Sequence, residues 1–154
     1  MADLDDIYSA RILELAGAIS RAGRLPSPDA SATAHSKLCG STVTIDLSMR
    51  DGRVSDYGQL VKACLLGQAA CSVVASQVIG SDAAELRAIG ATMRTMLKKG
   101  GPPPSGRWQD LAVLEPVRDY KGRHASVLLV FDAIESAITE IEQRAGTDHP
   151  AALA

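Results

Sequence analysis

Two cysteines flank a predicted β-hairpin, and their placement is the strongest chemical signal in the sequence. Cys39 comes shortly before an alternating segment at residues 42–49, and Cys64 directly follows a second segment at residues 54–63. The dipeptide Asp51-Gly52 between them is typical of a two-residue hairpin turn. Because an antiparallel hairpin returns the chain to its starting point, we expect both thiols at the same end of the sheet. Two thiols placed in this way can bind a metal ion or accept sulfur.

The elements that must position these cysteines are predicted from hydrophobic periodicity and turn residues. We expect a hairpin over residues 41–63 with a possible edge strand within residues 29–37. About five helices should pack against this sheet. They are expected at residues 3–22, 64–79, 82–99 and 108–117, and from about residue 124 onward. The fold class is therefore predicted to be α+β with a small antiparallel sheet.

Length and composition favour one domain in a reducing compartment. The chain has 154 residues, for which we expect a single domain at residues 1–146 and a flexible tail at residues 147–154. The Pro- and Gly-rich residues 100–107 are expected to form an extended insertion. The acidic start of the chain and the lack of a long apolar run predict a soluble, cytoplasmic protein that does not bind a membrane. In that compartment, three cysteines favour metal or sulfur chemistry over disulfides, although all three could instead be small buried hydrophobic residues.

The charge and aromatic content speak against nucleic acid as a ligand. The formal net charge is -2, so there is no overall electrostatic attraction to phosphate backbones. Aromatic residues make up only 3% of the chain, which leaves little for a surface on which bases could stack.

Three further residues are weaker candidates for the same site. Cys71 lies seven residues after Cys64, about 10.5 Å along a helix, so we assign it to the core and not to the same metal ion. His124, near the start of the last helix, is a possible substitute ligand, or an ordinary exposed histidine. His35, four residues before Cys39, has the same two interpretations. The basic residues Arg118, Lys121 and Arg123 either favour a nearby thiolate or belong to a solvated loop.

The chain resembles the U-type iron–sulfur cluster scaffolds, the NifU, IscU and SufU-like family, through an ordered set of short motifs. The stretch Leu4-Asp5-Asp6-Ile7-Tyr8 is similar to the family's opening helix. Cys39-Gly40 stands where the family has Cys-Gly-Asp, and Cys64 opens a helix of small residues that ends at Gly80. Pro116-Val117-Arg118 and Arg123 resemble the approach to the third family cysteine. The intervals 64 − 39 = 25 and 126 − 64 = 62 resemble the SufU-like branch.

The sequence departs from the family pattern at two ligand positions. Ser126 occupies the place of the third cysteine, and Ser41 occupies the place of the aspartate after Cys-Gly. The resemblance therefore implies Cys39 and Cys64 as the remaining metal and cluster ligands, with His124 as a possible substitute. A serine hydroxyl is a poor ligand for zinc or iron near neutral pH, because it is not ionised. We expect an iron–sulfur cluster or zinc to be weakly bound or absent.

The resemblance implies a scaffold and not an enzyme. A cysteine desulfurase would supply sulfur, iron or zinc would join it, and downstream apo-proteins would receive the product. A second hypothesis keeps the fold without a stable cluster, as a sulfur acceptor or a regulator that binds the desulfurase. A third, remote hypothesis is a thiol hydrolase that uses Cys39 or Cys64 with His124 as base. Metal content after purification separates the first two hypotheses, and activity that depends on His124 but survives chelation would favour the third.

Overall fold

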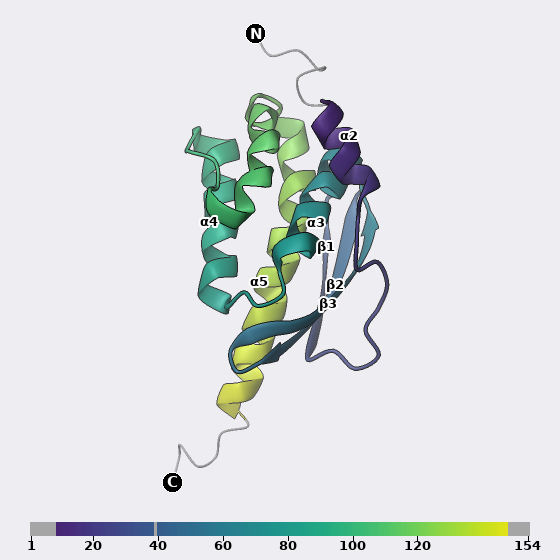
Figure 1. Cartoon of the computed structure of the whole chain (residues 1–154), viewed down its shortest axis with the longest axis vertical. Coiled ribbons are helices and arrows are strands. Elements are labelled where there is room, and N and C mark those ends of the chain that lie inside the picture. The colour runs from purple at the N-terminus through teal and green to yellow at the C-terminus, as the bar shows by residue number, and fades with distance from the viewer. Residues whose placement is uncertain (1–8, 39, 148–154) are drawn as a thin grey trace.

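The computed structural model, which describes residues 9–38 and 40–147, contains an antiparallel sheet covered on one face by helices (Figure 1). The strands are β1 (Ala30–His35), β2 (Thr42–Arg50) and β3 (Arg53–Lys62), in the spatial order β1-β2-β3. The α-helices are α2 (Ala10–Gly17), α3 (Leu65–Gln77), α4 (Ala83–Lys99) and α5 (His124–Thr147). Two 3-10 helices are η1 (Gly106–Asp119) and η2 (Lys121–Arg123). The predicted α+β class, hairpin and edge strand are confirmed.

The hairpin turn forms because its two central residues accept left-handed backbone conformations. Asp51 has φ of 56° and Gly52 has φ of 77°, the two positive angles that a type I′ turn requires. The turn sets the register in which Thr42 faces Lys62 at the other end of the hairpin. His35 of β1 also faces Thr42. The loop between β1 and β2 therefore lies at the same end of the sheet as the exit from β3.

The core lies between the sheet and the helices α3 and α5. Val43, Ile45 and Leu47 point from β2 toward these helices and are fully buried. Helix α4 and the 3-10 helix η1 pack on the far side of α3 and α5, as Figure 1 shows for α4. None of the helices in the described part of the chain is both long and apolar enough to cross a bilayer.

The first helix ends earlier than the sequence predicts. We expected a helix to about residue 22, but α2 stops at Gly17 and Ala22 instead forms a parallel bridge with Gln59 of β3. The Gly23 amide donates to the Gln59 carbonyl (2.8 Å), and the Gln59 amide donates to the Arg21 carbonyl (3.0 Å). Pairing with a strand edge thus replaces the last helical turn. The part of the prediction before residue 9 lies outside the described residues.

The segment after the prolines also differs from its prediction. We expected a short helix at residues 108–117 that is closed by Pro116, followed by a basic loop. The structure instead has η1 from Gly106 to Asp119, with Pro116 inside it, and η2 from Lys121 to Arg123. The side chains of Trp108, Leu111 and Leu114 are buried against the rest of the domain. Their burial shows that tertiary packing holds this 3-10 conformation, which is otherwise found mainly in short pieces.

The buried carboxylate of Asp46 holds the segment that connects α2 to β1 against the outer face of the sheet. Asp46 of β2 is fully buried and accepts hydrogen bonds from Arg24 Nε (2.7 Å), the Leu25 amide (2.9 Å) and Ser31 Oγ. Burial alone would raise the pKa of Asp46. The hydrogen bonds from Arg24, Ser31 and Leu25, together with the Arg24 charge, instead lower that pKa below its ordinary value.

Replacing Asp46 by Asn should therefore destabilise the fold in a pH-dependent way. We expect a loss of about 2 kcal/mol in the free energy of unfolding at pH 7, because charge-assisted hydrogen bonds to a buried group are lost. The native pKa lies below the unfolded one, so this stabilisation is present above about pH 4 and disappears as the pH falls through the native pKa. Urea unfolding of both proteins between pH 3 and pH 7 measures the difference. Asp132→Asn, which removes an exposed ion pair with Arg94, is the matched control; an equal loss there would contradict this account.

Candidate functional site

Cys64 stands at the junction of β3 and α3. It is the N-cap residue of α3, has an extended backbone with φ of -67° and ψ of 171°, and is half-buried. Its side chain makes no capping hydrogen bond to the helix. The thiol therefore lies at a helix N-terminus, where the helix dipole favours a negative charge such as that of a thiolate.

The first turn of α5 packs directly on the first turn of α3. A Cβ atom added to Gly67 would lie 3.0 Å from the carbonyl oxygen of Ser126 and 2.9 Å from the Cβ of Ala63. A side chain at residue 67 would therefore require Ala63 or the start of α5 to shift. Ser126 is 1% exposed, so it lies inside the domain. Gly67, the residue that its carbonyl approaches, follows Cys64 by about one turn of α3.

The loop between β1 and β2 completes this end of the domain. The Ser36 amide donates to the Ser41 carbonyl, and the Gly40 amide donates to the Ser36 carbonyl, both at 2.9 Å. Ser41 is 4% exposed, and the hydroxyl of Ser36 is buried without a hydrogen-bond partner among the described residues. Cys39 itself lies outside the described residues, so its predicted closeness to Cys64 stays a prediction.

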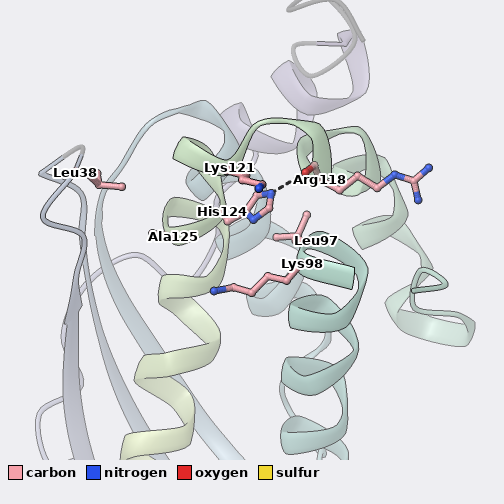
Figure 2. Close-up of a pocket in the computed structure, with 7 residues that line it drawn as sticks. All are labelled: Leu38, Leu97, Lys98, Arg118, Lys121, His124 and Ala125. Carbon is pink, nitrogen blue, oxygen red and sulfur yellow. Dashed lines mark hydrogen bonds between the residues drawn. The ribbon is translucent and has the colours of Figure 1, made fainter. Parts of the chain in front are cut away.

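A cavity of about 430 Å³ opens between this loop, the end of α4 and the start of α5 (Figure 2). Seven residues line it: Leu38, Leu97, Lys98, Arg118, Lys121, His124 and Ala125. In Figure 2 the guanidinium of Arg118 points away from His124, and it lies 3.9 Å from Glu115. The basic side chains that remain at the cavity are Lys98 and Lys121. Their positive charge suits an anionic ligand or a metal ion that is bound by thiolates.

His124 is the first residue of α5, and its ring is held firmly. The side chain is 8% exposed, and Nε2 lies 3.1 Å from the Val117 carbonyl oxygen and 3.0 Å from that of Arg118. The second interpretation of His124 from the sequence, an ordinary exposed histidine, is therefore wrong.

Neither of the two remaining candidates faces the site. Cys71 is 1% exposed in the core, and burial raises the pKa of its thiol to about 12, so the thiol stays protonated. His35 is exposed on β1, and its Nδ1 lies 3.1 Å from Thr42 Oγ1 of the neighbouring strand. Because Ala34 and Ser36 point from β1 toward the helices, His35 points to the opposite face of the sheet.

The described residues supply some of the donors that a metal would need. Within residues 9–38 and 40–147, no three side chains of His, Cys, Asp or Glu form a group able to hold a metal ion. Cys64 and His124 lie at the same end of the domain, and a complete ligand set would also need a donor from outside this range. The sequence prediction missed the close contact at Gly67. Its signal was a glycine inside a helix, which often marks the close approach of another backbone.

Solved structures and a curated relative agree on what this fold is. No family model matches the chain. A NifU-like protein (N-terminal) from Brucella abortus, described as nitrogen-fixing, is 59% identical to it, with a TM-score of 0.89. That match covers 91% of this chain and 97% of the other. The scaffold protein IscU of Thermotoga maritima is 22% identical over 89% of this chain and 96% of its own length.

A more distant structure shares the fold alone. A protein assigned as an iron–sulfur cluster assembly scaffold for the SUF system of Fervidobacterium islandicum is 20% identical with a TM-score of 0.80. This match covers 88% of this chain and 99% of the other. The relatives whose names state a role are assembly scaffolds and not enzymes. With 59% identity to the Brucella protein over nearly its whole length, the chain belongs to the IscU/NifU-like scaffold family.

Proposed function

We propose that this protein is an iron–sulfur cluster assembly scaffold-like protein that accepts sulfur, and iron or zinc, at Cys39 and Cys64. The observation that carries the proposal is the position of Cys64 in a chain of this family. Its thiol is half-buried, lies at a helix N-terminus and does not cap the helix. It is thus accessible enough to react and placed where a thiolate is favoured.

The sulfur step requires only a thiolate of this protein and a persulfide donor. The thiolate of Cys64 or Cys39 would attack the outer sulfur of a persulfide on a cysteine desulfurase. A new S–S bond forms on the acceptor cysteine, the donor's S–S bond breaks, and the donor cysteine leaves as a thiolate. Lys98 and Lys121 at the cavity would stabilise the anionic sulfur that arrives. Downstream apo-proteins would then receive the product.

The two serines favour a second candidate function. Ser41 and Ser126, which the sequence resemblance assigns to ligand positions of the family, are both buried, and neither would supply an anionic donor. A paralogue that accepts sulfur or regulates the desulfurase, without holding a stable cluster, would need only the cysteines.

Metal and sulfide analysis of protein purified without oxygen tests the proposal. After incubation with a cysteine desulfurase, cysteine and ferrous iron, we expect sulfur bound to the protein and iron or zinc below one equivalent. Sulfur without any metal would favour the paralogue. A protein that acquires neither sulfur nor metal would contradict both functions.

A further inference from the structure

The two edges of the sheet differ in how the chain covers them. Two segments, at residues 21–23 and 80–81, run along the edge of β3 and form backbone hydrogen bonds with Gln59 and Val54. At the opposite edge, β1 pairs with β2 on one side, and no other part of the described chain pairs with its second side. The edge of β1 is therefore open.

The hydrogen-bond pattern of β1 leaves Ser31, Thr33 and His35 facing this open edge. In an antiparallel pair, the backbone groups of successive residues point alternately toward and away from the neighbouring strand. The Ser36 amide donates to the Ser41 carbonyl, so the even-numbered residues of β1 bond to β2 and the odd-numbered residues face away. All three outward residues are exposed, and no residue of the described chain hydrogen-bonds to their N–H and C=O groups.

The strand β1 carries none of the features that keep a free edge from pairing. Proteins protect such an edge with a charge, a proline or a β-bulge. The six residues Ala30–His35 include no lysine, arginine, carboxylate or proline, and the register with β2 has no bulge. Ala32 and Ala34 face the helices but are only half-buried, whereas Ile45 beside them on β2 is fully buried. An added strand would cover this apolar surface.

The sequence of β1 complements itself when two copies pair antiparallel about Thr33. In that register Thr33 faces Thr33 of the second copy, and Ser31 faces His35 of the second copy. Each of these pairs exchanges two backbone hydrogen bonds, so every outward N–H and C=O group of both strands finds a partner. On the helix side, Ala32 faces Ala34 of the second copy, which joins the two half-buried apolar surfaces.

The charges at the two ends of β1 also match in this register. Asp29 comes four residues before Thr33, and Lys37 comes four residues after it. Each end of the paired strands therefore brings Asp29 of one copy opposite Lys37 of the other, and opposite charges across two strands are stabilising. A strand of another protein could add to the same edge. The matched charges favour a second copy of this chain.

We propose that β1 pairs with β1 of a second copy, so that the protein forms a two-fold symmetric dimer with one continuous sheet. A two-fold interface needs a surface that complements itself, and the register centred on Thr33 provides one. Because the paired strands are antiparallel, the Cys64 ends of the two copies lie at opposite ends of the dimer. The dimer goes beyond the proposed function and does not depend on it.

Thr33→Pro tests the pairing, because it removes an N–H group that points away from β2. Proline is tolerated on an edge strand where the N–H faces solvent, so the monomer should keep its circular dichroism spectrum and Tm. In sedimentation equilibrium from about 10 μM to about 1 mM, the wild type should dimerise, and Thr33→Pro should lower the association constant at least about tenfold. The control Thr33→Val keeps the backbone hydrogen bonds and should dimerise like the wild type.

Two further measurements remain decisive if the proline variant is unstable. Lys37→Glu places a like charge opposite Asp29 and should weaken the dimer about fivefold, whereas the control Lys62→Glu, on β3, should not. In hydrogen exchange, the amides of Ser31, Thr33 and His35 should become protected as the protein concentration rises.

Three results would overturn the proposal. The first is a wild type that stays monomeric over this concentration range, and the second is a dimer that a folded Thr33→Pro variant leaves unchanged. The third is protection of the outward amides of β1 only after another protein is added, which would assign the edge to a strand of that protein.

Discussion

A protein carrying both Ser41→Asp and Ser126→Cys should bind zinc stoichiometrically, or a cluster with visible absorption, much more tightly than the wild type. Complete four-ligand zinc sites have apparent binding energies of about 10–16 kcal/mol, so each restored donor should contribute about 3 kcal/mol. That corresponds to about a hundredfold in Kd for each substitution. Reconstitution with iron and sulfide, or titration with zinc, measures the gain.

The double variant should also be less stable than the wild type when no metal is bound, because both serines are buried. Ser41 is 4% exposed and Ser126 is 1% exposed, so the new carboxylate and thiol enter a nearly closed environment. An unpaired buried carboxylate is unfavourable, and we expect the metal-free double variant to melt at a lower temperature than the wild type. Metal should then raise its Tm more than it raises that of the wild type.

Ser72→Cys is the matched control for the added thiol. Ser72 is also buried, at 5% exposure, but it lies on α3 beside Cys71, two turns beyond Cys64. This variant should gain no metal affinity. If the double variant gains none either, then the pocket has diverged beyond its two serines, and the transfer of the family's ligand positions to Ser41 and Ser126 is wrong.

Replacing Cys64 by Ala should abolish metal binding and sulfur transfer at that position, whereas Cys71→Ala should leave both nearly unchanged. Cys64 is half-buried at a helix N-terminus, and Cys71 is 1% exposed with a thiol whose pKa is raised by burial to about 12. The first is accessible to a metal ion or a sulfur donor, and the second is kept protonated by burial. Cys39→Ala should behave like Cys64→Ala. Zinc titration and mass spectrometry after desulfurase treatment measure both effects.

The rates at which the thiols react provide an independent check. In the folded protein, an alkylating reagent should modify Cys64 rapidly and Cys71 only after unfolding. If the Cys64 and Cys71 variants lost sulfur transfer equally, Cys71 would have a role in the transfer, and its assignment as a residue that only packs in the core would be wrong.

Local signals in the sequence were sufficient for the elements that frame the site. Asp51-Gly52 predicts a turn with two positive φ angles, and the alternation of Val43, Ile45 and Leu47 predicts which face of β2 is buried. Either Ser81 or Asp82 was expected to cap α4, and Asp82 is the cap, since its carboxylate accepts a hydrogen bond from the Glu85 amide at 2.8 Å. Such signals act between residues that are close in sequence, so they can be recognised without the rest of the fold.

The predictions failed where a distant partner decides the backbone. The sequence after Gly17 is compatible with a further helical turn. In the structure, the backbone of Arg21 and Gly23 instead forms hydrogen bonds with the backbone of Gln59 in β3. Likewise, residues around Pro116 adopt a continuous 3-10 helix because the buried side chains of Trp108, Leu111 and Leu114 pack against the helical layer. Hydrophobic periodicity cannot indicate either partner.

The sequence by itself determined the family resemblance, the α+β class, and a hairpin with a cysteine on each side. The assignment of Ser41 and Ser126 to altered ligand positions stays a prediction. Only the tertiary structure decided which histidine could join the site. The sequence alone made His35 and His124 similar candidates, but β1 points His35 away from the helices, while two carbonyls at the end of η1 orient His124. The direction of a side chain depends on the face of its strand or helix and on groups many residues away, and both are set by packing.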